Sequence, residues 1–419
     1  MKADKIRELI NQMTLEEKAS LCSGLDFWHT KGIERLGIPS VMVTDGPHGL
    51  RKQVEAADHL GLNESVEAVC FPAGCALAAS FSREAAERLG ETLGKECQAE
   101  KVSTILGPAM NIKRSPLCGR NFEYYSEDPF LATEMGTAYV NGVQSQNVGT
   151  SPKHFMANSQ EYHRMTSSSD MDERTAREIY LAAFEGMVRN AKPWTIMNSY
   201  NMLNGTYLCE NKEILTDVLR KDWGFDGYVM TDWGAMNRRV EALKAGCNLE
   251  MPGGSCVTDA QIVKAVEEGE LEEEVLDRSC EELLNIVFRY AENQREDVVF
   301  DRNADHEIAR ALEEECIVLL KNEDAILPIS EDEKVVLIGK YAKSPRYQGG
   351  GSSHINSSKV ESAFETITKW ANVDYAQGYD DAEDITDERL IQEAVELAEN
   401  AGKAVIFAGL PDSFESEGY

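Results

Sequence analysis

The sequence predicts an α/β protein, with a TIM-like (β/α)8 barrel followed by an incomplete α/β sandwich unit. Short apolar runs alternate with helical stretches up to about residue 290. Nearly every one of these runs ends in polar or charged residues, as in barrels that gather such residues on one face. A doubly wound sheet is the competing layout. The sequence has no Gly-x-Gly-x-x-Gly turn of the kind that often follows the first strand of that fold.

The composition is that of an acidic globular chain. Of its 419 residues, 42% are hydrophobic, which is enough to bury a large core. The formal net charge is −31, so nucleic acid would be repelled at long range. No apolar stretch approaches the length of a membrane span. We therefore expect neither nucleic acid nor a membrane as a partner.

The ten cysteines are scattered, and none forms a Cys-x-x-Cys pair with metal-ligand spacing. We expect most of them to be small buried residues, and we predict neither a metal site nor an organic cofactor. The N-terminus begins directly as an amphipathic helix with no signal-peptide core, which makes a cytoplasmic location the expectation.

The barrel is expected over residues 1–292. Its first helical element spans about Lys2 to Cys22 and is restarted by the capping box Thr14-Leu15-Glu16-Glu17. Buried parallel strands are expected at 41–43, 104–106, 194–197 and 227–230. Helices are expected between them, for example at 83–97 and 172–190.

A charged stretch at 293–306 is typical of an interdomain linker, and a second α/β unit is expected at 307–419. Its first helix, from about Glu307, would carry the apolar run Ile317-Val318-Leu319-Leu320. Strands at 335–338 and 404–408 would flank a helix at about 386–400. We expect this unit to be incomplete, because the chain stops soon after its last strand.

Asp232 is the first candidate for chemistry, because it follows a predicted strand and precedes Trp233 and Gly234. A carboxylate at such a position can be held rigidly and still face a cavity, and the indole offers a flat apolar surface to a sugar ring. A helix N-cap, which is common after strands, is the alternative reading of Asp232.

Further polar residues stand at the ends of other predicted strands. Asp45 follows one strand, where an Asx turn explains it equally well, and Lys153 and His154 end another. Adjacent strand residues point to opposite faces, so both reach one cavity only if the strand bends there. A lone Lys or His in such a place is usually an ordinary hydrogen-bonding residue. The accumulation of these groups favours a site for a neutral polyol.

Three other segments bear on this site. The segment 119–123 contains Arg120, for which a structural salt bridge is an equal alternative, and the segment 198–201 contains Tyr200. The glycine-rich run 349–353 is not a Walker motif, because no Lys-Ser or Lys-Thr follows the glycines. We interpret it as a flexible loop over a neighbouring site.

Together these segments resemble glycoside hydrolase family 3, in its multidomain β-glucosidase branch. The segments that carry the resemblance are Met13-Thr14-Leu15-Glu16-Glu17-Lys18, Asp45-Gly46-Pro47, Gly119-Arg120-Asn121-Phe122-Glu123, Lys153-His154-Phe155, Thr231-Asp232-Trp233-Gly234-Ala235 and Glu417-Gly418-Tyr419. The resemblance implies an active site in the cleft between a barrel and an α/β sandwich domain.

The resemblance also implies a role for each residue. Asp232 would be the nucleophile and Glu417 the acid/base of a retaining β-glycosidase that releases terminal β-D-glycosyl residues from oligosaccharides or small glycosides. Lys153 and Arg164 would keep Asp232 ionised, while Glu417 titrates near neutral. The residues implied to bind the sugar are Asp45, Arg51, Arg120, Lys153, His154, Arg164, Tyr200, Trp233 and Ser352.

Several alternatives stay open. The single-domain N-acetylglucosaminidase branch has Pro-Gly-His after Lys-His-Phe, where this chain has Met156-Ala157-Asn158, so the two-domain mechanism is preferred. Family members continue beyond the Glu-Gly-Tyr segment, so we expect a further segment or a second polypeptide to complete the second unit. Otherwise the chain is a sugar-binding fragment without turnover. A barrel lyase or aldolase with a Schiff base on Lys153 is more distant. We make no prediction of the oligomeric state.

Overall fold

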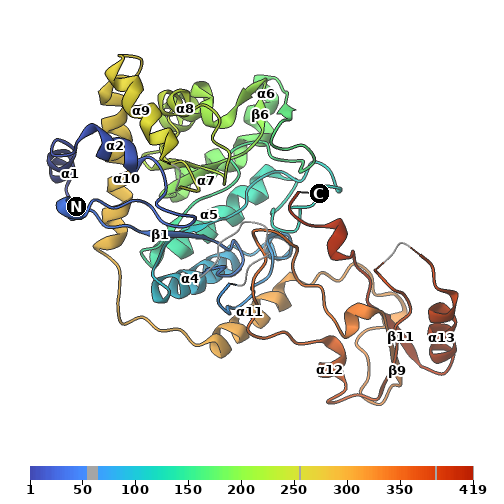
Figure 1. The fold of residues 1–419 in the computed structure, drawn as a ribbon. Helices are drawn as coiled ribbons and strands as arrows, with labels where there is room; N and C mark the ends of the chain where they lie inside the picture. Colours follow the sequence, from blue (N-terminus) through green and yellow to red (C-terminus); the bar gives the residue numbers. More distant parts are fainter. Residues whose placement is uncertain (54–64, 254–255, 383–384, 419) are drawn as a thin grey trace.

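The computed structural model describes residues 1–53, 65–253, 256–382 and 385–418. Figure 1 shows a barrel surrounded by helices and, beside it, a smaller α/β unit. The last residues leave the small unit and return to the barrel, so the C-terminal end lies against the barrel rather than beside the small sheet. This return brings residues near 417 to the barrel.

The barrel interior is built from short, fully buried strands. The predicted strands are confirmed, with bounds β1 (Met42–Asp45), β2 (Val102–Leu106), β5 (Thr195–Asn198) and β8 (Tyr228–Thr231). β2 pairs in parallel with β1 and with β3 (Gly149–Thr150), and β5 pairs in parallel with β8. All residues of these strands are buried, which is why the sequence shows continuous rather than alternating apolar runs.

Single bridges join the strands into a ring. The parallel bridges are Ala109↔Lys153, Phe155↔Asn198, Met230↔Leu249 and Ser23↔Glu250. The ring closes through the segment around His29, which runs antiparallel to Met42. The predicted TIM-like barrel is therefore confirmed, with one antiparallel segment in its ring.

Helices surround the ring. Their bounds are α1 (Ala3–Ile10), α2 (Leu15–Leu21), α3 (Gly74–Ala79), α4 (Arg83–Ala99), α5 (Pro129–Ser145), α6 (Glu173–Thr175), α7 (Ala182–Ala191), α8 (Arg239–Ala245), α9 (Val257–Glu267) and α10 (Glu273–Ala291). The predicted capping box is present, since Thr14 accepts from the Glu17 amide and Glu17 from the Thr14 amide. The predicted helix over 172–190 is continuous but mixed, because 176–180 is a π-helical segment between α6 and α7. A second π-helical segment covers Glu213–Asp222. A small separate sheet is formed by β4 (Ser168–Ser169), β6 (Met202–Leu203) and β7 (Thr206–Tyr207).

The second unit has a parallel sheet with β9 (Val335–Ile338) between β10 (Val373–Ala376) and β11 (Lys403–Ile406). Its helices are α12 (Ala363–Ile367) and α13 (Glu388–Glu399). The strand and helix predictions at 335–338, 386–400 and 404–408 are confirmed to within two residues at every end. β10, which carries the polar residue Asp374, was not predicted from the sequence.

The predicted first helix of this unit is partly wrong. α11 (Arg302–Cys316) begins within the predicted linker, because Asp301 caps it by accepting from the Asn303 and Ala304 amides. Ile317 is extended, so the apolar run 317–320 lies beyond the helix and is exposed. The domain boundaries at 292 and 307 stay a prediction.

Two general properties follow from this fold. Seven of the ten cysteines are buried, as expected for small apolar residues. Within the described part of the chain, no helix is both long and apolar enough to cross a bilayer.

Helix α4 of the barrel packs closely against its neighbour α5 and also contacts α11. Gly142 of α5 makes the first contact possible, because a Cβ at this position would lie 2.2 Å from the Glu87 carbonyl oxygen of α4. Backbone atoms cannot move aside as a flexible side chain can, so only glycine fits here.

We therefore expect Gly142→Ala to destabilise the protein by about 1–3 kcal/mol, despite the better helix propensity of Ala. Gly136→Ala on the same helix is the control, because the close contacts of its added Cβ are with the flexible end of the Met110 side chain rather than with backbone. Urea unfolding of both variants and the unchanged protein measures the difference. Equal midpoints for the two variants would contradict this interpretation of the helix contact.

Candidate active site

The two strand-end aspartates occupy the predicted face of the barrel. Asp45 ends β1, and Asp232 directly follows β8, where its amide donates to the Asn198 carbonyl of β5 (3.1 Å). Both side chains are buried. Asp232 is not the N-cap of α8, which is Arg238, so the capping alternative is excluded.

The carboxylate of Asp232 has one oxygen held and one available. Oδ1 accepts the Trp233 amide at 2.7 Å. Oδ2 is buried and accepts no hydrogen bond from any residue that the structure describes, and His154 Nε2 lies 3.6 Å from it. Burial raises the pKa of Asp232, although the charges of Arg164 and Arg120 oppose this. An oxygen fixed in direction and free of donors has the geometry required of a nucleophile.

Lys153 and His154 both reach this site, which was expected only if the strand bends there. The peptide bond between them is cis, and both side chains are buried. Lys153 Nζ lies 3.3 Å from Asp45 Oδ1, and Arg51 Nη1 lies 3.4 Å from Asp45 Oδ2. Asp45 is therefore an ion-pair partner within the site.

The imidazole of His154 is held by the residues around it. Its backbone amide donates to Asn111 Oδ1 (2.7 Å), and its Nδ1 lies 3.3 Å from the Tyr124 hydroxyl. Burial lowers the pKa of His154 well below its ordinary value, and the neighbouring Arg120 and Lys153 lower it further. These shifts favour the neutral form of the ring, which takes part in the site through hydrogen bonds.

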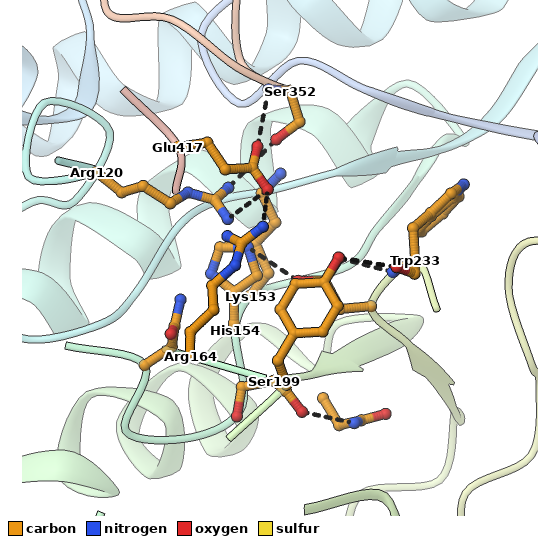
Figure 2. Close-up of polar contacts among 12 residues, drawn as sticks. Arg120, Lys153, His154, Arg164, Ser199, Trp233, Ser352 and Glu417 are labelled. Carbon is orange, nitrogen blue, oxygen red and sulfur yellow. Dashed lines mark hydrogen bonds and ion pairs between the residues drawn. The ribbon is translucent and has the colours of Figure 1, made fainter. Parts of the chain in front are cut away.

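Figure 2 shows the contacts that hold Glu417 in the site. Arg164 Nη2 lies 2.7 Å and Arg120 Nη1 3.4 Å from Glu417 Oε1. The Ser352 amide donates to Oε2 at 2.9 Å, and Arg120 Nη2 donates to the Ser352 hydroxyl at 3.3 Å. The predicted residues Arg120, Arg164, Ser352 and Glu417 thus form one connected network.

The electrostatics of Glu417 differ from the prediction. Burial raises the pKa of Glu417, but the two guanidinium groups outweigh burial and leave this pKa well below its ordinary range. The prediction that Glu417 titrates near neutral is therefore wrong, and the reason is that both arginines contact Glu417 directly. Lys153 and Arg164 do act on Asp232 in the predicted direction, because both lower its pKa, but burial has the larger effect and raises it.

The glycine-rich loop 349–353 lies against the segment that carries Glu417. Gly350 pairs in parallel with Ser416. Gly351 has a φ of +91°, and a Cβ there would lie 2.4 Å from Glu417 Cβ. Only glycine permits so close an approach, which explains the run of glycines before Ser352.

Tyr200 and Trp233 line the site beside Asp232. The Tyr200 hydroxyl donates to the Trp233 carbonyl at 2.9 Å, and the Arg164 guanidinium lies 4.5 Å from the centre of the Tyr200 ring. The Trp233 indole N–H donates to the Phe27 carbonyl (2.9 Å), which orients the ring. Trp233 therefore contributes an apolar face, while its polar atom is already bonded.

Glu415 is turned away from this network. It pairs with Arg346 at 2.8 Å and lines a neighbouring cleft of about 660 Å³ together with Phe71, Arg310 and Tyr347. Neither Asp232 nor Glu417 lines that cleft. Glu417, and not Glu415, is therefore the carboxylate of this segment that faces Arg120 and Arg164.

Two buried carboxylates of the site, Glu123 and Glu161, were not predicted from the sequence to have a role there. Glu123 pairs with Arg120 and accepts from the Ser353 hydroxyl at 2.6 Å. Glu161 pairs with Arg164 at 2.7 Å. Arg120 therefore forms the salt bridge offered as its alternative and also contacts Glu417. Each Glu lies three residues from its Arg in the sequence, but both pairs lie in turns rather than helices, so this spacing was only a weak signal.

The site holds no cluster that points to a metal. Among the described residues, no group of three or more His, Cys, Asp or Glu side chains is arranged to hold a metal ion. The cations within the site are the side chains of Arg51, Arg120, Lys153 and Arg164.

Relatives of known structure share this architecture. The chain superimposes on a GH3 beta-glucosidase from Bifidobacterium adolescentis with a TM-score of 0.92 and 47% identity, covering 98% of this chain and 59% of that one. Beta-glucosidase 3B from Thermotoga neapolitana, solved in complex with alpha-D-glucose, gives a TM-score of 0.90 and 35% identity over 99% of this chain and 63% of that one.

Curated relatives match along nearly the whole chain. Thermostable beta-glucosidase B from Acetivibrio thermocellus is 54% identical over 418 residues, which is 99% of this chain and 55% of the relative. An exo-alpha-(1->6)-L-arabinopyranosidase from Bifidobacterium longum is 47% identical over 422 aligned positions, covering 98% and 56%. The chain thus spans about half the length of these relatives.

The family models cover both units. The glycosyl hydrolase family 3 N-terminal domain matches residues 15–286, and the C-terminal domain of the same family matches residues 317–419. With the barrel, the second α/β unit and the carboxylate pair in place, the chain belongs to glycosyl hydrolase family 3.

Proposed function

We propose that this protein is a retaining β-glucosidase that releases terminal glucose from small β-glucosides or oligosaccharides. The observation that carries the proposal is that two carboxylates, Asp232 and Glu417, lie buried in one site. Asp232 Oδ2 accepts no hydrogen bond from the described residues, and the charge of Arg164, which contacts Glu417, also acts on Asp232. Glucose is the favoured sugar because relatives of 54% and 47% identity are beta-glucosidases. The cytoplasmic location stays a prediction from the sequence.

The polar groups around Asp232 suit a neutral sugar. Asp45 offers acceptor oxygens, while Lys153 and His154 offer donors beside it. Trp233 offers an apolar face. A sugar hydroxyl is both a donor and an acceptor, so this mixture of fixed groups can orient the ring at the barrel face.

The first step would form a glycosyl-enzyme. Asp232 Oδ2 attacks the anomeric carbon as the bond to the glycosidic oxygen breaks, and Glu417 gives its proton to that oxygen. In the second step water attacks the anomeric carbon, Glu417 takes a proton from the water, and the bond to Asp232 breaks. Two displacements at one carbon retain its configuration.

Glu417 must be protonated for the first step, which its two arginines oppose. We propose that the bound substrate weakens the effect of these two arginines on the pKa of Glu417. Sugar hydroxyls that accept from Arg120 and Arg164 would compete with Glu417 for the guanidinium N–H groups. Burial favours the neutral carboxyl. With the arginines engaged by the sugar, burial would have the larger effect and the pKa of Glu417 would rise.

The geometry speaks against the lyase or aldolase alternative. A Schiff base needs the neutral amine of Lys153, whereas Lys153 Nζ is buried in an ion pair with Asp45. Borohydride in the presence of a carbonyl substrate should leave Lys153 unmodified.

The nucleophile is tested with a 2-fluoro-glucoside inactivator and with Asp232→Asn. Mass spectrometry should find a covalent adduct on the peptide containing Asp232, and Asp232→Asn should lower kcat/KM for an aryl β-glucoside on the order of 10³-fold or more. Asp259→Asn removes a buried, ion-paired carboxylate outside the site and is the control. A protein that binds glucose but hydrolyses no β-glucoside would instead be the sugar-binding fragment.

The pH profile tests the electrostatics of the site. Arg164 lowers the pKa of both Glu417 and Asp232, so removing its charge raises both. Arg164→Met should therefore move both limbs of the kcat/KM profile of the carboxylate pair to higher pH. Arg238→Met, at an exposed arginine paired with Glu210, is the control. Limbs that stay in place or move to lower pH would contradict the assigned electrostatics.

A further inference from the structure

Glu161 is a buried barrel carboxylate that contacts the end of the second unit. Its side chain has no exposed surface. Oε2 accepts from Arg164 Nη1 at 2.7 Å and also from the Gly418 amide at 2.9 Å, while Oε1 accepts from Asn158 Nδ2 at 3.1 Å. One oxygen thus joins a barrel arginine to the backbone of the residue that follows Glu417.

Arg164 completes a closed arrangement. One of its terminal nitrogens bonds Glu161, and the other lies 2.7 Å from Glu417 Oε1. Glu161 therefore holds Glu417 in two ways, through the guanidinium that contacts the Glu417 side chain and through the next backbone amide. Hydrogen bonds to an ionised acceptor are about twice as strong as neutral ones, so both contacts depend on the charge of Glu161.

A second carboxylate forms a similar link on the other side of Glu417. Glu123 joins Arg120 to the Ser353 hydroxyl of the glycine-rich loop. It does so without a hydrogen bond to the Glu417 segment among the contacts described. Glu161 is the more direct link, because its acceptor oxygen reaches the backbone beside Glu417.

We propose that Glu161 is a positioning residue for the acid/base: it fixes the Glu417 carboxyl where a proton can reach the glycosidic oxygen. This inference rests on the proposed function. Glu161 does not touch the reacting atoms, so it acts only through Arg164 and Gly418. Its loss should therefore impair proton transfer more than nucleophilic attack.

The test compares two β-glucosides that differ in their need for a proton. Phenyl β-D-glucoside has a poor leaving group, whereas 2,4-dinitrophenolate departs from its glucoside without protonation. Glu161→Gln should lower kcat/KM for the phenyl glucoside by about 100-fold and for the dinitrophenyl glucoside by less than about tenfold. Glu417→Gln defines the difference expected when the acid is lost entirely.

Two further variants separate charge, reach and folding. Glu161→Asp keeps the charge but is shorter by about 1.5 Å, so it cannot hold Arg164 and Gly418 together and should also act selectively on the phenyl glucoside. Glu210→Gln is the matched control, since Glu210 is a buried carboxylate paired with Arg238 outside the site. Its kcat/KM values should stay unchanged, and thermal unfolding compares the folding of all variants.

Hydrogen exchange provides a readout that does not need turnover. The amides of residues 415–418 should exchange faster in Glu161→Gln and Glu161→Asp than in the unchanged protein or Glu210→Gln. Equal losses on both glucosides, or unchanged exchange, would overturn the positioning role. If the protein without substitutions hydrolysed neither glucoside, the proposed function would be overturned. Faster exchange of the 415–418 amides in the Glu161 variants would still show that Glu161 anchors this segment.

Discussion

The pairing of buried charge holds this site together. Glu417 is buried, and a buried ionised carboxylate is stable only beside positive charge. Arg120 and Arg164 supply that charge from the barrel, and each arginine is in turn paired with a second buried carboxylate, Glu123 or Glu161. Because each buried charge needs a partner, the ion pairs that begin at Glu417 in the second unit continue into the barrel.

The barrel and the second unit contribute differently to this network. The barrel supplies Asp232 and the arginines from strand ends and loops supported by a buried ring of strands. The second unit supplies Glu417 and the Ser352 amide from chain segments that return to the barrel (Figure 1). Because Gly351 lets the loop approach Glu417 closely, these two segments act together as one wall of the site.

Much of the fold and the site could be predicted from local patterns. Buried parallel strands are continuous apolar runs, so β1, β2, β5, β8 and β9 are visible in the sequence, whereas the more polar β10 is not. Helix α11 was misplaced because its start depends on the cap at Asp301. Asp301 lies in a charged segment whose composition is typical of a linker, so the cap was not recognised. The residues assigned by family resemblance do meet in one site, but Glu123 and Glu161 were missed since salt bridges of this spacing are common.

The sequence by itself determined the alternation of strands and helices, the strand-end positions of Asp45 and Asp232, and the family to which the chain belongs. These depend on local periodicity and on ordered motifs. Only the tertiary structure decided which carboxylate the arginines contact, and hence that the pKa of Glu417 is lowered while that of Asp232 is raised. The physical reason is that pKa values depend on distances of a few ångströms between residues such as Arg164 and Glu417, which are 253 positions apart in the chain.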